Sequence, residues 1–145
     1  MVGNQEEDFD KREVSSLMSR IDLVNPKEDL FDSVAKGLAE EMAKINKKNK
    51  PSQIRKFYDE LLMWREKAQN EEKFSEILPL IKMMRSKVYY AKGRDLVSDG
   101  FVLWFDGCMG KITGGSKEGL KAFANFCYLY EAFLGFYKNV RPKDN

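Results

Sequence analysis

The sequence predicts an all-α protein, folded as a compact single-domain bundle of about five to six helices. Apolar residues recur at helical spacing along most of the 145-residue chain. The composition, 43% apolar and 33% charged, is typical of a globular protein. A chain of this length can bury one real core, and the sequence contains no long repeat and no sign of a second domain.

The bundle is expected to cover residues 10–140. Residues 1–9 are polar and acidic and are predicted to be disordered, while residues 141–145 are predicted to form a short tail. The N-terminal residues do not resemble a secretory signal, and no apolar run approaches the 18 residues of a membrane span. We therefore expect a cytoplasmic protein without a membrane partner.

Apolar stripes define the first two helices. Residues 10–24 are expected to form a short helix with one apolar side, made by Val14, Leu17, Met18 and Ile21. Pro26 suits a helix start, because proline lacks the N–H that an interior position needs. A second helix is therefore expected from about Lys27 to Ile45, followed by a polar linker over residues 47–50.

The clearest amphipathic pattern begins at Pro51, with Ser52 as the expected N-cap. Its core face comprises Ile54, Phe57, Tyr58, Leu61, Leu62, Arg65 and Ala68. A fourth helix is expected from about Pro79 to Lys92, because proline fits a first turn, with Gly93 as the left-handed residue at its end. The core stripe of this helix is Ile81, Met84, Val88 and Ala91.

Residues 96–109 are apolar on most sides and predict a buried fifth helix, although Phe101–Phe105 alone would fit a strand equally well. Ser116 is expected to cap a last helix that reaches about Asn139. The main face of this helix comprises Leu120, Phe123, Ala124, Cys127, Tyr130, Leu134 and Tyr137.

The chain contains no histidine, which excludes Ser-His-Asp and Cys-His catalysis and zinc sites with imidazole ligands. The two cysteines, Cys108 and Cys127, are too few for a zinc site and are expected to be buried thiols. Gly110-Lys111 does not complete a phosphate-binding loop, since that motif would need glycine at 105 and Ser or Thr at 112. We therefore expect no enzyme, no catalytic residue, no metal and no cofactor.

Charge is arranged in blocks, although the formal net charge is only +2. Residues 44–56 contain six basic and no acidic side chains, and residues 82–94 contain five basic and no acidic ones. Residues 1–43, by contrast, contain 11 acidic and five basic side chains. Two such basic blocks can bind a polyanion even when the whole chain is nearly neutral.

The start of the third helix contradicts a rule of helix stability. Helix N-termini favour acidic residues, yet the start of this helix has basic ones: Lys50, Arg55 and Lys56. Its first acidic residue is Asp59. A phosphate bound at the amides of residues 52–54 would resolve the conflict. The alternative is that the linker lysines are simply solvated.

The fourth helix interleaves cations with tyrosines on both sides of its core stripe. One side carries Lys82, Arg85, Tyr89 and Lys92, and the other carries Met83, Lys87, Tyr90 and Arg94. Cations can contact phosphates while tyrosine rings stack on bases or sugars. The alternative is that the tyrosines are partly buried and belong to the core.

These patterns predict a sequence-independent binder of RNA or of single strands, since phosphate contacts read no sequence. The candidate RNA-binding residues are Lys50, Ser52, Gln53, Arg55, Lys56, Lys82, Arg85, Lys87, Lys92 and Arg94. A second hypothesis is a protein–protein adaptor whose basic patches bind acidic partner surfaces.

Two segments of the chain resemble motifs of the small subunit of the type III-A CRISPR interference complex, the Csm complex. The first runs from Lys50 to Tyr58 and contains Ser-Gln-Ile-Arg, and the second runs from Leu78 to Arg94 and ends in Lys-Val-Tyr-Tyr-Ala-Lys-Gly-Arg. The segment from Leu120 to Lys138 is similar to the aromatic C-terminal helix of that family.

The resemblance implies a small, non-catalytic helical subunit that is present in several copies. Such copies stack beside the backbone subunit, contact the large subunit, and together cradle CRISPR RNA and its target RNA in antiviral defence. Arg55, Lys87 and Arg94 stand at the basic positions of the family's motifs.

Overall fold

The computed structural model describes the backbone of residues 2–114 and 116–145 and the side chains of residues 10–114 and 116–145. All regular structure in these residues is helical, which confirms the expected all-helical, single-domain bundle. The elements are α1 (Val2–Met18), a π-helical turn η1 (Leu30–Val34), α2 (Ala35–Ala43), α3 (Pro51–Lys67), α4 (Glu71–Lys82), α5 (Met84–Gly93), α6 (Asp99–Gly110) and α7 (Lys117–Val140). Within the described residues, no helix combines the length and apolar character that a membrane crossing requires.

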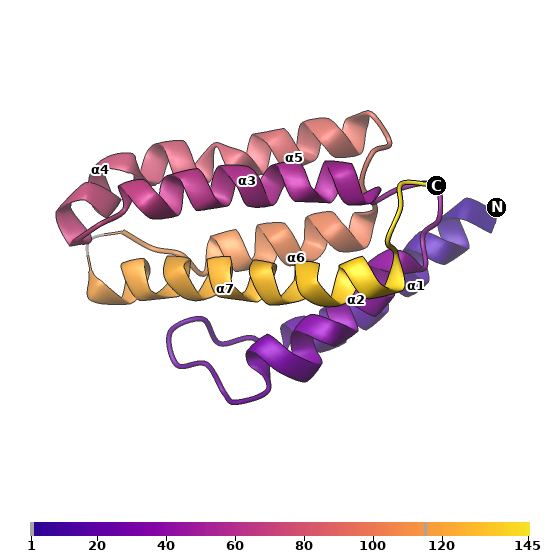
Figure 1. Cartoon of the computed structure of the whole chain (residues 1–145), viewed down its shortest axis with the longest axis horizontal. Coiled ribbons are helices and arrows are strands. Elements are labelled where there is room, and N and C mark those ends of the chain that lie inside the picture. Colours follow the sequence, from indigo (N-terminus) through magenta and orange to yellow (C-terminus); the bar gives the residue numbers. More distant parts are fainter. Residues whose placement is uncertain (1, 115) are drawn as a thin grey trace.

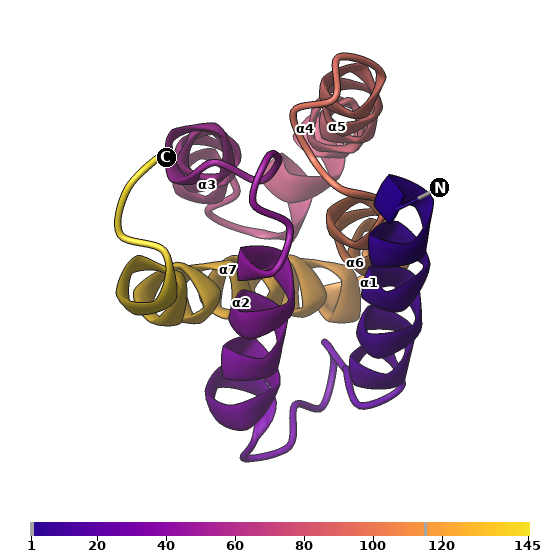
Figure 2. The same cartoon turned by 90° about the vertical axis from the view of Figure 1, so that its right-hand side faces the viewer.

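The helices form layers around α6 and α7. In both views, α3 and the α4–α5 run lie on one side of these two helices, and the α4–α5 run is antiparallel to α3 (Figures 1 and 2). α3 packs on α7, and α5 packs on α6. α1 and α2 cover the other side, α1 against α6 and α2 against α7. The two predicted basic segments are therefore neighbours in space.

Aromatic side chains fill the centre of the bundle, between α6 and α7. The rings of Trp104 and Tyr130 are 5.3 Å apart between centroids, as are those of Phe105 and Phe126. All four side chains are fully buried, and each such pair adds about 0.5–1.5 kcal/mol beyond the burial of its area. The prediction of a buried helix, rather than a strand, in residues 96–109 is confirmed.

A buried asparagine fixes the segment between α2 and α3. Asn49 is fully buried and has a positive φ of 59°, a conformation that asparagine tolerates better than most residues. Its amide nitrogen donates to the Met42 carbonyl at 3.3 Å and to the Ser98 hydroxyl at 2.9 Å, and its amide oxygen accepts from the Ser98 N–H at 2.9 Å. The Tyr137 hydroxyl donates to the Asn49 carbonyl. The expected polar linker is therefore anchored in the core and joins α2, α6 and α7.

Arg141 holds the same segment from the end of α7. Its side chain is buried, and its guanidinium donates to the carbonyls of Ile45 at 3.4 Å, Asn46 at 2.6 Å and Lys48. Backbone carbonyls of the segment between α2 and α3 thus receive charge-assisted hydrogen bonds. The predicted tail, residues 141–145, begins with a residue of the core.

A carboxylate attaches α1 to the start of α6. The Gly100 N–H donates to Asp10 Oδ2 at 2.6 Å, and a Cβ at position 100 would lie 2.1 Å from that oxygen, so the contact requires glycine. α1 ends at Met18, earlier than the predicted residue 24, and Ile21 is buried beyond its end. The side chains of residues 1–9 lie outside the described set, so the disorder predicted there remains a prediction.

Two predicted helix starts are wrong. Pro26 does not open the second helix, which begins at Leu30 with the π-helical turn and continues as α2. α4 begins at Glu71 rather than at Pro79, because the Asn70 side chain accepts from the Lys73 N–H at 2.9 Å and caps the helix.

Pro79 lies inside α4, where it cannot donate a hydrogen bond to the preceding turn. The helix ends three residues later, and Met83 alone separates α4 from α5. The left-handed residue after α5 is Asp95, with φ of 59°, rather than Gly93. The buried stripe from Ile81 to Ala91 is nevertheless confirmed, because the break changes the helix direction without losing its apolar side.

We expect Asn49→Ala to lower the free energy of unfolding by about 2–4 kcal/mol, because it leaves the Ser98 N–H and the Met42 carbonyl without their side-chain partner. Urea denaturation measures the loss. Asn46→Ala is the matched control in the same loop, since Arg141 contacts only the backbone carbonyl of Asn46. Its effect should stay within about 0.5 kcal/mol. Equal losses for the two variants would contradict the role assigned to Asn49.

Candidate nucleic-acid interface

The start of α3 and the end of α5 lie on the same side of the molecule (Figures 1 and 2). An ion pair sets the register of the two antiparallel runs, with Lys87 Nζ 2.7 Å from Glu60 Oε1. Since each residue advances a helix by about 1.5 Å, Lys56 then lies level with the last turn of α5, which is followed by Arg94. The start of α3 and the end of α5, which carry the two basic segments, therefore lie at the same end of the two antiparallel runs.

One side of the α4–α5 run is bound to α6. The Lys82 ammonium donates to the Met109 carbonyl, the Arg85 guanidinium donates to Asp106, and the Tyr89 hydroxyl donates to Asp106 Oδ2 at 3.0 Å. Lys92 Nζ lies 3.3 Å from Asp99 Oδ1. All four predicted residues on this side therefore have partners within the chain and hold α5 in place.

These contacts change the proton affinities of the groups concerned. Burial pushes the pKa of Asp106 upward, but hydrogen bonds from Arg85 and Tyr89 outweigh it and lower the pKa overall. The bond to Asp106 raises the pKa of Arg85 and of Tyr89. Burial lowers the pKa of Lys82. The negative charge of the Asp106 carboxylate is therefore balanced by hydrogen bonds from Arg85 and Tyr89.

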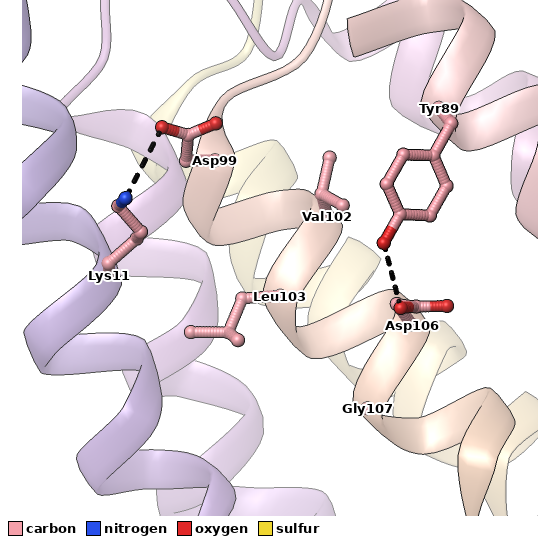
Figure 3. A pocket seen from close by; sticks show the side chains of 7 residues that line it. All are labelled: Lys11, Tyr89, Asp99, Val102, Leu103, Asp106 and Gly107. Atoms are coloured by element: carbon pink, nitrogen blue, oxygen red, sulfur yellow. Dashed lines mark hydrogen bonds and ion pairs between the residues drawn. The ribbon is translucent and has the colours of Figure 1, made fainter.

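An open pocket of about 300 Å³ lies beside these contacts, between α1, α5 and α6 (Figure 3). Its lining comprises Lys11, Tyr89, Asp99, Val102, Leu103, Asp106 and Gly107. Figure 3 shows Lys11 bound to Asp99 and Tyr89 bound to Asp106. Both carboxylates of the pocket thus form ion pairs: Asp99 with Lys11 and Lys92, and Asp106 with Arg85. Within the described residues, no group of three or more potential metal ligands comes together.

The opposite side of α5 points outward. Met83, Tyr90 and Arg94 are exposed, and the Tyr90 side chain, at 68%, is the most exposed of the large apolar ones. The Arg94 guanidinium carbon lies 5.9 Å from the centre of the Tyr90 ring. Lys87 is half-exposed and pairs with Glu60, which also accepts from the Trp64 indole N–H at 3.1 Å. The structure thus separates the two tyrosines: Tyr89 is bound to α6, whereas the Tyr90 ring is exposed beside Arg94.

The start of α3 differs from the prediction. Lys50 is the N-cap and Pro51 the first helical residue, so the assignment of Ser52 as N-cap is wrong. The N–H groups of Gln53 and Ile54 donate to the Lys50 carbonyl at 2.9 and 3.0 Å. Proline causes this shift, because its fixed φ suits the first helical position.

An internal anion already occupies the Ser52 donors. The Ser52 N–H donates to Asp144 Oδ1 at 2.9 Å, and its hydroxyl donates to Asp144 Oδ2 at 2.6 Å. These bonds, with the nearby Lys50 charge, lower the pKa of Asp144. The amides of residues 52–54, where the sequence predicts a phosphate, have internal partners in the structure: a carboxylate from the C-terminal tail takes one amide, and the Lys50 carbonyl takes the other two.

The remaining cations of α3 are exposed. Arg55 Nε lies 3.1 Å from Asp59 Oδ1, an ion pair in which both side chains are more than half exposed. Among the described residues, neither Lys50 nor Lys56 forms an ion pair. Gln53 is half-buried in the first turn. Of the ten predicted binding residues, the outward set is thus Lys50, Arg55, Lys56, Lys87 and Arg94.

Sequence reasoning missed Asp144 and Arg141, which position the start of α3 from the C-terminal tail. Neither residue belongs to an amphipathic stripe or to a recognised motif, so the sequence carries no signal for them. Both cysteines are free and buried, and burial raises the pKa of Cys108 and of Cys127 to about 12. The expectation of two buried thiols is confirmed.

Residues 25–143, most of the chain, match the model of the protein family described as Csm2 Type III-A. Comparisons with curated proteins and with solved structures give no match.

We expect neither cysteine of the folded chain to react with a thiol reagent at pH 8, because burial favours the protonated form and blocks access. Reaction with an aromatic disulfide reagent, followed by absorbance, should give no signal in buffer and two thiols per chain in denaturant. Rapid labelling of Cys127 in the native protein would contradict the packing of α7.

Proposed function

Because the chain belongs to the Csm2 Type III-A family, and so is a small subunit of the type III-A CRISPR Csm complex, we propose that it acts as a non-catalytic RNA-binding subunit. It contacts the backbone of target RNA and CRISPR RNA without reading their sequence. The surface that binds, here called the α3–α5 face, comprises Lys50, Arg55, Lys56, Lys87, Tyr90 and Arg94.

The observation that supports this proposal most directly is the position of Lys56 and Arg94. Both are exposed, and the register set by the Lys87–Glu60 pair puts Lys56 level with the last turn of α5, just before Arg94; within the described residues neither has a carboxylate partner. Beside Arg94, Tyr90 offers an exposed ring. Cations beside an exposed aromatic ring are the combination with which proteins bind single strands, because phosphates meet the charges and bases meet the ring.

Arg55 and Lys87 can bind RNA by exchanging a carboxylate partner for a phosphate. In the Lys87–Glu60 pair, Lys87 is half exposed and Glu60 is mostly covered, whereas the Arg55–Asp59 pair is largely exposed. Exposed pairs are worth only about 0–1 kcal/mol. A phosphate can therefore replace the carboxylate at modest cost. Release of counterions from the strand then favours the exchange at low salt.

Lys82, Arg85 and Lys92 have a different task in this proposal. Their bonds to the Met109 carbonyl, Asp106 and Asp99 attach the end of α4 and α5 to α6, and so set the direction of the outer side of α5. We regard them as positioning residues that add general positive charge. Gln53 and Ser52 lie at the edge of the face.

The proposal extends to assembly. Several copies of the chain, placed beside the backbone and large subunits, would each make a few weak phosphate contacts whose sum is strong. Free, buried cysteines suit a reducing compartment, and we place the complex in the cytoplasm on that ground.

A protein–protein adaptor is the second candidate. One observation favours it: two of the basic groups, Arg55 and Lys87, already bind carboxylates of this chain, Asp59 and Glu60. The exposed Leu80 and Met83 would add apolar contact to such an interface. Polyglutamate that displaces RNA as effectively as RNA itself would favour the adaptor.

We expect Lys56→Gln and Arg94→Gln each to weaken binding of a mixed-sequence single-stranded RNA by about fivefold at 0.1 M salt, because each removes one phosphate contact. The plot of log affinity against log salt should flatten by about 0.7 per variant. Fluorescence anisotropy with a labelled RNA measures both quantities, and RNAs of unrelated sequence should give the same values.

Lys121→Gln removes the same charge from an exposed position near the start of α7 and is the matched control. Its salt dependence should equal that of the unmodified protein. Unchanged slopes in both Lys56→Gln and Arg94→Gln would sink the proposed α3–α5 face.

We expect Tyr90→Leu to weaken RNA binding by about 1–3 kcal/mol without changing the salt slope, because a stacking contact carries no charge. Tyr90→Phe keeps the ring and should bind normally. Tyr128→Leu alters an exposed tyrosine that contacts Phe31 instead, and it should also bind normally. The same anisotropy titration decides; equal affinity of the Leu and Phe variants at position 90 would exclude stacking.

A further inference from the structure

The C-terminal tail returns to the basic start of α3. After α7, residues 141–145 turn towards α3, and the C-terminus lies beside its first turn (Figures 1 and 2). Arg141 is buried and anchors the base of the tail on three carbonyls of the α2–α3 segment. The Lys138 ammonium donates to the Pro142 carbonyl at 3.1 Å and guides the chain across the end of α7. The tail is therefore directed to one place.

At the first turn of α3, the Asp144 carboxylate of the tail accepts two hydrogen bonds from Ser52. Asp144 Oδ1 and Oδ2 accept from the Ser52 N–H and hydroxyl at 2.9 and 2.6 Å. The first turn of α3 contains no acidic residue of its own, so Asp144 supplies the negative charge that this helix end favours. Lys50 lies close enough for its charge to lower the pKa of Asp144.

A phosphate has the same chemistry as this carboxylate. Both present two oxygens that accept hydrogen bonds from an N–H and an O–H, and both are attracted by Lys50. Asp144 and Ser52 are exposed, so the bond between them is in contact with water and can exchange. The base of the tail would stay in place during exchange, because Arg141 is held independently of Asp144.

From these contacts, and on the basis of the proposed function, we infer that the C-terminal tail is an internal competitor of RNA: Asp144 occupies the start of the α3–α5 face, and a phosphate of the strand displaces it. A single phosphate gains little, since it replaces one oxyanion by another. A strand that also reaches Lys56 and Arg94 gains the further contacts and opens the tail. The tail thereby disfavours short or isolated anions relative to continuous RNA.

The experiment compares Asp144→Ala with the unmodified full-length chain in the anisotropy titration. If the tail occupies the site about nine-tenths of the time, its removal raises the apparent RNA affinity about tenfold. Glu76→Ala, an exposed carboxylate on α4, changes the net charge equally and should leave the affinity nearly unchanged. In a Ser52→Ala background, which has already lost the hydroxyl donor to the tail, Asp144→Ala should give a smaller gain.

Equal or weaker binding by Asp144→Ala, or an equal gain for Glu76→Ala, would overturn the inference while leaving the proposed function intact. Lack of salt-dependent RNA binding by both the unmodified chain and Asp144→Ala would instead overturn the proposed function and the inference with it. If Asp144→Ala raised the affinity for polyglutamate as much as the affinity for RNA, the inference would also be overturned, because the tail would then compete with acidic protein surfaces.

Discussion

The arrangement of the α3–α5 face depends on the buried hydrogen bonds of Asn49. This one side chain bonds to the end of α2 and to the start of α6, and the backbone carbonyl of the same residue accepts from the Tyr137 hydroxyl of α7. A buried amide that is fully paired specifies one geometry, since any other leaves polar groups unpaired in the core. The residue that follows is Lys50, the N-cap of α3, so the core dictates where the basic surface begins.

Patterns of apolar residues were enough to predict most of the fold. Trp104, Phe105 and Tyr130 lie in the core as expected, because helical spacing alone determines which side of a long helix is apolar. The errors fall at helix ends. Pro79 was expected to open a helix, but α4 begins earlier, where the Asn70 side chain caps it. A helix that is capped in this way tolerates the one hydrogen bond that Pro79 cannot make.

The candidate site could be predicted only in part. The basic residues and their helices follow from local sequence, but which cations are available depends on partners far away in the chain. Arg85 and Asp106 lie 21 positions apart, and Ser52 and Asp144 lie 92 apart. No local rule connects such residues, since the packing of α5 on α6 and the return of the tail bring them together. Of the two predicted stripes of cations and tyrosines, the structure therefore binds one to α6 and turns the other outward.

The carboxylate of Glu60 gives the outward side one more property. It receives both the Lys87 ammonium and the Trp64 indole N–H, whereas Trp104 is sealed in the core with no exposed surface. When Lys87 turns to another anion, Glu60 keeps only the indole, and the polarity around that ring changes. The chain thus contains an intrinsic optical reporter of events on α5, together with a second indole that serves as a constant internal reference.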